Sequence, residues 1–212
     1  MSGVQLSLSN DLQKESVLIL ACGALANEIQ AVIKANCWQN HFDLQCLSAE
    51  LHNTPELIAP ELEKKIRYWK PRYSSIYLAY GDCGSKGAID RLLQTEKVER
   101  LPGAHCYEFF AGKELFSELF EEEPGTFFLT DYLTRNFERL VVKGLKLDKH
   151  PELLSVFFSN YKRVIYLVQR DDPKLSTMAF EIAEYLNLEF EKRYCGYGEL
   201  EPALQQQVLA VG

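Results

Sequence analysis

At residues 75–87 the chain reads Ser75-Ile76-Tyr77-Leu78-Ala79-Tyr80-Gly81-Asp82-Cys83-Gly84-Ser85-Lys86-Gly87. The first six residues favour a β-strand, and a helical pattern follows the glycine-rich segment. We therefore expect a strand-to-helix turn that places Cys83 at the carboxyl end of a strand. In an open α/β sheet this edge is where ligands bind, because loops and helix amino termini converge there.

Each of the first four predicted strands is followed by a residue type that binds metals. Besides Cys83, these residues are Cys22 after the first strand, His52 after the second and Cys106 after the fourth. If the strands are ordered 2-1-3-4, as in one common doubly wound arrangement, the turns that carry them become neighbours. The sequence thus predicts one ligand cluster at this edge.

Strand and helix patterns alternate along the chain without a repeat. This alternation predicts an α/β fold with an open, mostly parallel, doubly wound sheet and helices on both faces. We expect a polar N-terminal tail at 1–15 and a single domain at 16–212, with a helical insertion at about 130–161 that covers the sheet edge or the site. Strands are expected at 17–21, 42–47, 75–80, 98–101, 163–168 and 188–194, whereas 126–129 is either a strand or an apolar lead into a helix.

Composition excludes several classes of partner. The chain has 212 residues, 47% of them hydrophobic, which is enough for a sizeable core. Its formal net charge is −7 and it has no Lys/Arg run, so we expect neither nucleic acid nor an anionic membrane surface as a partner. No stretch approaches the roughly 20 apolar residues of a membrane span, and no signal peptide is visible. We therefore expect a cytoplasmic protein.

In the reducing cytoplasm, the six cysteines are expected to be free thiols or metal ligands rather than a disulfide framework. They form no Cys-x-x-Cys pair, so a metal site would have to be assembled from distant segments. Cys46 shares one face of its predicted strand with Phe42 and Leu44, and we expect it in the core.

Cys22, Cys83 and Cys106 are the predicted metal ligands, with His52 as a fourth and His105 as the alternative to it; either histidine is otherwise an acid or base. Soft thiolates select iron-sulfur clusters, zinc or copper(I). Four ligands would close a structural zinc site, whereas three cysteines would leave a position open for a substrate. An iron-sulfur cluster is the first expectation and zinc is the alternative.

Other residues of these turns are candidates for catalysis or cofactor binding. His105 is suited to general acid/base chemistry near neutral pH, and Asp82 and Glu108 flank two of the candidate ligands. Three glycines are candidates for close approach to a cofactor: Gly23, Gly81 and Gly84. The turn after residue 80 does not match the phosphate-loop pattern, so nucleotide binding is a minor alternative.

Several motifs together resemble a prokaryotic domain-of-unknown-function family. They are Ala21-Cys22-Gly23-Ala24-Leu25, Leu51-His52-Asn53, Tyr80-Gly81-Asp82-Cys83-Gly84, Leu101-Pro102-Gly103-Ala104-His105-Cys106-Tyr107-Glu108-Phe109, Pro124-Gly125-Thr126-Phe127-Phe128-Leu129-Thr130-Asp131 and Gly196-Tyr197-Gly198. The resemblance spans about residues 16–200. Members of this family often accompany corrinoid-dependent methyltransferases, which implies a place in one-carbon or methyl-group metabolism and a corrinoid methyltransferase system as a partner.

Three hypotheses follow. The first is a metalloprotein that acts on a small molecule. The second is a protein that binds a small molecule or corrinoid at the same edge without turning it over. The third is metal-free nucleophilic catalysis by Cys83 or Cys106, activated by a histidine and a helix amino terminus.

Overall fold

Two parallel β-sheets form the framework of the protein. The computed structural model describes residues 14–211. The first sheet has the order β2-β1-β3-β4 and the second has the order β5-β6-β7. The strands are β1 (Lys14–Cys22), β2 (Phe42–Leu47), β3 (Tyr73–Ala79), β4 (Glu99–Arg100), β5 (Thr126–Leu129), β6 (Arg163–Val168) and β7 (Glu189–Tyr194). Every paired strand is parallel to its neighbour, which confirms the α/β class. The first four strands have the 2-1-3-4 order on which the expected ligand cluster depended.

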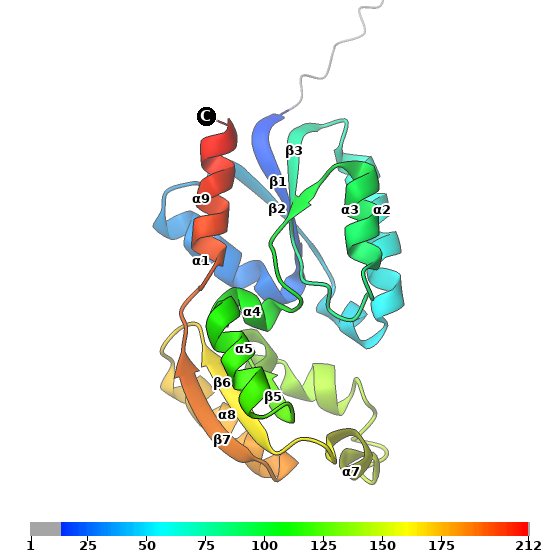
Figure 1. The fold of residues 1–212 in the computed structure, drawn as a ribbon, viewed down its shortest axis with the longest axis vertical. Coiled ribbons are helices and arrows are strands. Elements are labelled where there is room, and N and C mark those ends of the chain that lie inside the picture. The colour runs from blue at the N-terminus through cyan, green and yellow to red at the C-terminus, as the bar shows by residue number, and fades with distance from the viewer. Residues whose placement is uncertain (1–13, 212) are drawn as a thin grey trace, which may run out of the picture.

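Helices cover both faces of each sheet (Figure 1). We call the first sheet with α1, α2, α3 and α9 the first lobe, and the second sheet with α5, α6, α7 and α8 the second lobe; α4 joins them. The α-helices are α1 (Ala26–Ala35), α2 (Ile58–Trp69), α3 (Ala88–Glu96), α4 (Cys106–Ala111), α5 (Lys113–Glu122), α6 (Asp131–Arg135), α7 (Leu153–Phe158), α8 (Pro173–Leu186) and α9 (Leu200–Val211). Short 3-10 helices lie at Gly23–Leu25, Ala49–Asn53 and Pro55–Leu57, and a π-helical turn at Glu138–Val142.

The first lobe is built around β1. Its residues Val17 to Ala21 are almost completely buried, as expected for a central strand covered on both faces. Helices α1 and α9 lie on one face of the sheet, and α2 and α3 on the other (Figure 1). Helix α9 was not predicted from the sequence; it packs against β1 and buries Leu200 and Leu204.

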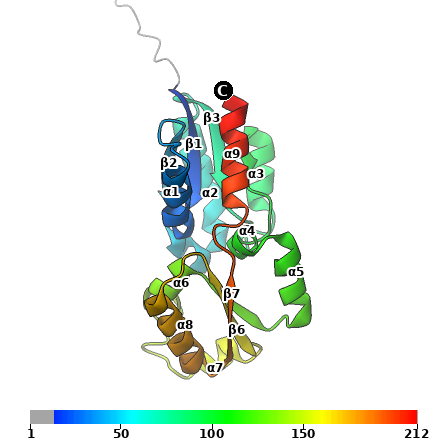
Figure 2. The ribbon, with the colours of Figure 1, turned by 90° about the vertical axis from the view of Figure 1, so that its left-hand side faces the viewer.

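The second lobe has its own sheet, so the strands do not form the one continuous sheet that the sequence predicts. Figure 2 shows α8 and α6 on one side of β6 and β7, and α5 on the other. The two sides have separate hydrophobic clusters, one under α8 and one under α5. The helical segment predicted at about 130–161 is the crossover from β5 to β6, since Thr126–Leu129 is a strand that pairs with β6.

The carboxyl edges of the two sheets face each other (Figure 1). The 3-10 turn that follows β1 contacts α6, which begins directly after β5. Two cavities lie between the edges and are lined by residues of both lobes. Because ligands bind at the carboxyl edge of parallel sheets, the fold directs two such edges at one region.

The chain passes between the lobes twice. It leaves the first lobe where α4 meets α5 and returns through residues 195–199 into α9. The backbone N–H of Glu199 donates a hydrogen bond to the carbonyl of Phe109 at 2.7 Å, so the two passages lie side by side.

Two predictions from the sequence need correction or lie outside the structure. Cys46 is exposed: β2 is the outer strand of the first sheet, and along its face Phe42 is buried, Leu44 is half-buried and Cys46 is exposed. Residues 1–13 of the predicted tail lie outside the described residues, while β1 already begins at Lys14. The single domain at 16–212 stays a prediction.

Candidate functional site: a buried cluster of thiols and imidazoles

Three cysteines converge at the carboxyl edge of the first sheet. Cys22 ends β1, Cys83 lies in the turn after β3, and Cys106 is the first residue of α4. Cys22 is 2% exposed and Cys83 is 9% exposed. His52, in the 3-10 helix after β2, completes the group. The strand order β2-β1-β3 places these turns next to one another, as the sequence predicts.

His52 contacts Cys22 across 30 residues of sequence. The distance from Cys22 Sγ to His52 Nδ1 is 4.0 Å, and Nδ1 lies 2.9 Å from the carbonyl oxygen of Ala49. A carbonyl only accepts hydrogen bonds, so Nδ1 carries the proton directed at Ala49 and Nε2 is left for another partner. The ring also stacks on Tyr80, with centroids 6.1 Å apart and an interplanar angle of 13°.

The surroundings of Cys83 favour its thiolate form. Hydrogen bonding with Cys106, His105 and His52 outweighs burial and lowers the pKa of Cys83 to about 3. Its backbone is in the left-handed region, with φ +46°, which is unusual for a residue with a side chain. The structure therefore presents Cys83 in the charged form that binds metals or acts as a nucleophile.

The pKa values of the groups around Cys83 are raised, whereas that of Cys83 is lowered. Burial alone would lower the pKa of His52, but hydrogen bonds to Cys22 and Cys83 outweigh it and raise the pKa to about 11. Hydrogen bonding to Cys83 raises the pKa of His105 against the effect of burial. The pKa of the Cys106 thiol is raised well above its usual value by its hydrogen bond to Cys83 and by burial. Hydrogen bonding thus favours the thiolate form of Cys83 and the protonated form of both histidines.

Tyr80, which the sequence analysis did not single out, belongs to the cluster. Its hydroxyl is buried next to Cys22 and has no well-aligned hydrogen-bond partner. Burial and the neighbouring thiols raise the pKa of this phenol, so it stays protonated. Its place directly after the third strand and before Gly81 is the signal that could have identified it.

As the side chains stand, residues 14–211 contain no group of three or more His, Cys, Asp or Glu side chains spaced to hold a metal ion. Cys22 Sγ and His52 Nδ1 are 4.0 Å apart, and the pKa shifts of Cys83 and His52 reflect hydrogen bonding among the thiol and imidazole groups. A metal ion would replace these hydrogen bonds with coordination bonds.

The carboxylates predicted to assist catalysis, Asp82 and Glu108, accept hydrogen bonds from backbone N–H groups of the neighbouring loops. Asp82 accepts hydrogen bonds from the Ser85 hydroxyl at 2.6 Å and the Gly87 N–H at 2.8 Å, which fixes the turn after Cys83. Burial opposes ionisation of Asp82, but these bonds outweigh it and lower its pKa. Glu108 Oε2 accepts from the N–H of Ala104 at 2.8 Å and so fixes the loop before Cys106. A role for either carboxylate in catalysis stays a prediction.

The glycines predicted to approach a cofactor allow backbone segments to meet. A Cβ at Gly81 would lie 3.0 Å from the Cα of His105, and one at Gly23 would lie 2.9 Å from the carbonyl of Leu47. Gly84 is in the left-handed region, with φ +83°. These positions bring the ligand-bearing turns together, and cofactor binding by them stays a prediction.

An apolar cavity of about 180 Å³ adjoins the cluster. Cys106 and His52 line it from the first lobe, and Thr130, Tyr132 and Leu140 from the second. The segment between β5 and β6 therefore forms one wall of this cavity. The cavity suits a ligand of a few heavy atoms.

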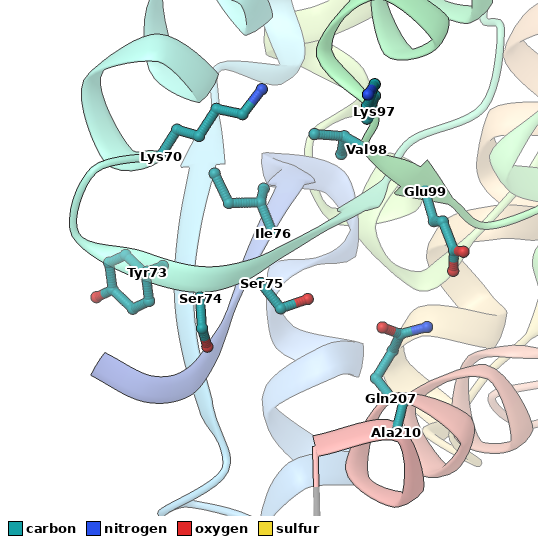
Figure 3. Close-up of a pocket in the computed structure, with 10 residues that line it drawn as sticks. All are labelled: Lys70, Tyr73, Ser74, Ser75, Ile76, Lys97, Val98, Glu99, Gln207 and Ala210. Carbon is teal, nitrogen blue, oxygen red and sulfur yellow. The ribbon is translucent and has the colours of Figure 1, made fainter. Parts of the chain in front are cut away.

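A larger cavity of about 310 Å³ lies at the other edge of the first sheet (Figure 3). Figure 3 shows the side chains of Tyr73, Ser75 and Glu99, from the beginnings of β3 and β4, and that of Gln207 from α9. The amino edge of a parallel sheet is not where its ligands bind, and none of the cluster residues lines this cavity.

Comparison with curated proteins and with solved structures found no significant match. Of the helices between residues 14 and 211, none has both the length and the apolar character that a membrane crossing requires. A family model described as "Protein of unknown function (DUF1638)" matches residues 46–204, which include every residue of the cluster except Cys22. The match covers more than half of the sequence, and the chain therefore belongs to the DUF1638 family.

Proposed function

We propose that Cys22, Cys83 and Cys106 bind an iron-sulfur cluster, with zinc as the alternative, and that His52 is the fourth ligand. The observation that supports this proposal is the convergence of three thiols and two imidazoles from four separate turns in one mostly buried place. Thiolate and imidazole are the ligands preferred by these metals.

The environment of His52 fits a metal ligand. A histidine that binds metal through one nitrogen usually donates its other N–H to a carbonyl or carboxylate. Here Nδ1 faces the carbonyl of Ala49 at 2.9 Å, which leaves Nε2 for the metal. The unpartnered hydroxyl of Tyr80 beside Cys22 is a further fitting feature, because a metal-bound thiolate would accept its hydrogen bond.

We further propose that a small molecule binds in the apolar cavity of about 180 Å³ next to Cys106 and reacts at the metal, with His105 as acid or base. This reaction would require that the three cysteines alone hold the metal and that His52 acts as acid or base, because only then would an open metal position act as a Lewis acid toward the substrate. A cytoplasmic place in one-carbon or methyl-group metabolism, with a corrinoid methyltransferase system as partner, is proposed from the family resemblance alone.

The first experiment is elemental analysis and ultraviolet-visible spectroscopy of protein purified without oxygen. We expect near-stoichiometric iron with broad absorption near ~400 nm, or zinc without colour. The variants Cys22→Ala, Cys83→Ala and Cys106→Ala should each lose metal, whereas Cys46→Ala, on the exposed end of β2, should keep it. Equal metal in all four variants would rule out the proposed ligands.

A second candidate is metal-free nucleophilic catalysis by Cys83, and the low pKa of its thiol, about 3, favours it. In this case the protein would contain no metal, and Cys83 would react with iodoacetamide at pH ~5, where ordinary thiols are protonated. Mass spectrometry of tryptic peptides identifies the modified residue, with the exposed Cys37 as the comparison. Equal, slow alkylation of both cysteines would contradict this candidate.

A further inference from the structure

A second cavity between the lobes has the character of a binding site. Its volume is about 470 Å³, within the range of small-molecule sites. From the first lobe it is lined by residues of α1: Asn27, Glu28, Gln30, Ala31 and Lys34. From the other side it is lined by α6, which follows β5, and by the segments after β6 and β7: Asp131, Arg135, Arg170 and Tyr197. None of the cysteines or histidines of the thiol cluster lines it.

Glu28 has a buried carboxyl group, and one of its oxygens has no hydrogen-bond partner among the described residues. It lies in the first turn of α1, is 4% exposed and lines the cavity. Its carboxylate accepts a hydrogen bond from its own backbone N–H, but Oε2 has no partner. Burial raises the pKa of Glu28 despite the nearby arginines. A buried carboxylate oxygen without a donor is costly, so this position calls for a donor from a ligand.

In Asp131, across the cavity, both carboxylate oxygens accept hydrogen bonds. It is 2% exposed and accepts hydrogen bonds from the Tyr166 hydroxyl at 2.8 Å and from the backbone N–H groups of Gln169 and Arg170 at 3.2 Å each. Its other charged contact is with Arg135, 3.7 Å away. Asp131 therefore fixes the backbone at Arg170 and contacts the Arg135 guanidinium, and both arginines line the cavity from the second lobe.

The charges of the cavity are complementary to a zwitterion. Arg135, Arg170 and Lys34 line it together with Glu28, and both arginines act electrostatically on Glu28. Within residues 14–211, no carboxylate lies at ion-pair distance from the Arg170 guanidinium. Within the part of the chain that the structure describes, the cavity thus offers a buried acceptor without a donor on one side and, on the other, Arg170 without an ion pair beside Arg135, which contacts Asp131 at 3.7 Å.

We propose that this cavity binds a small zwitterion of the amino-acid class, whose amino group donates to Glu28 Oε2 and whose carboxylate is bound by Arg170 and Arg135. The proposal does not depend on a metal at the thiol cluster. Guanidinium groups bind carboxylates through paired, charge-assisted hydrogen bonds, and an ammonium group supplies the donor that Glu28 lacks.

The test is isothermal titration calorimetry of the full chain with the common amino acids, supported by thermal unfolding. Acetate and methylamine serve as probes that each carry only one of the two charged groups. We expect at least one amino acid to bind and both single-charge probes to bind about tenfold more weakly or not at all, since each lacks one charge-assisted contact.

Two variants separate the contacts. Arg170→Ala, at an exposed residue, should weaken binding of the amino acid about tenfold or more and leave the fold intact. Glu28→Gln should reduce the preference for the amino acid over acetate. Arg193→Ala, an exposed arginine on β7 outside the cavity, is the control and should bind as the wild type does. Binding of acetate as tight as that of every amino acid, or no binding of any amino acid at millimolar concentration, would overturn the proposal.

Discussion

The backbone N–H of Cys83 donates a hydrogen bond to the carbonyl of Ala104 at 3.1 Å. This bond joins the turn after β3 to the loop that carries His105 and Cys106. The two reactive segments are thereby fixed relative to each other by main chain, independently of the side chains. The close contact requires Gly81, because the loop passes directly over its Cα.

Replacing Gly81 with alanine should separate these two segments. The new Cβ would lie 3.0 Å from the Cα of His105 and 3.1 Å from the carbonyl of Ala104, which is too close for backbone atoms. We expect a loss of about 1–3 kcal/mol in the free energy of unfolding, measured by urea denaturation, together with lower metal content. Gly196→Ala is the control: its left-handed backbone makes it destabilising as well, but no atom lies within 4 Å of its Cβ, so metal content should be unchanged. Equal metal loss in both variants would contradict a local effect at the site.

The hydroxyl of Tyr80 should contribute little to stability in metal-free protein. It is buried without a well-aligned partner, so Tyr80→Phe should change the free energy of unfolding by less than about 1 kcal/mol. Tyr166→Phe is the matched control, because the Tyr166 hydroxyl donates to the buried Asp131 at 2.8 Å and its loss should cost about 1–3 kcal/mol. Equal losses in the two variants would show that Tyr80 has a strong partner.

Glu96 should make the stability depend on pH. Its hydrogen bonds with Lys70 and Arg67 lower its pKa below the usual 4.5. The folded carboxyl therefore holds its proton more weakly than the unfolded one, so its contribution is complete above the unfolded pKa and is lost as pH falls through the folded pKa. Glu96→Gln should cost about 1 kcal/mol at pH 7, since both cations are partly exposed, and nothing once the wild-type carboxyl is protonated. Denaturant unfolding across this pH range provides the measurement, with the exposed Glu118→Gln as control; a cost independent of pH would contradict the ion-pair explanation.

Leu204 should contribute strongly to the stability of the first lobe. It is completely buried, and α9, which carries it, packs on β1. Leu204→Ala should lower the free energy of unfolding by about 2–5 kcal/mol. Leu209 lies on the same helix and is 75% exposed, so Leu209→Ala should change it by less than about 0.5 kcal/mol. Similar effects of the two substitutions would mean that α9 does not dock as described.

The first lobe and its cluster were largely predictable, because the signals are local. The apolar run 17–21 and the helical pattern after it indicated β1 and α1, and the glycine-rich turn after residue 80 placed Cys83. The common 2-1-3-4 order then brought Cys22, Cys83 and His52 together. The same local pattern did not reveal that Nδ1 of His52 is occupied by a carbonyl.

The division into two sheets was not predictable from these patterns. A strand pattern shows that a segment is extended but not which strand it pairs with, and β4 and β5 look alike in this respect while they belong to different sheets. The prediction that Cys46 is buried was wrong for a related reason. Alternation of apolar and polar residues shows which face of a strand a side chain is on, but not whether a helix covers that face. Helix α9 was missed although its Leu200 and Leu204 have the spacing of one helical face.

The hydrogen bond between Glu199 and Phe109 joins the two places where the chain passes between the lobes. Because these connections lie side by side, an opening of the lobes would be a swing about this one place. Both cavities between the lobes lie along the edges that such a swing would separate. Occupants of the thiol side and of the Glu28 side would therefore favour the same closed state and assist each other's binding without touching.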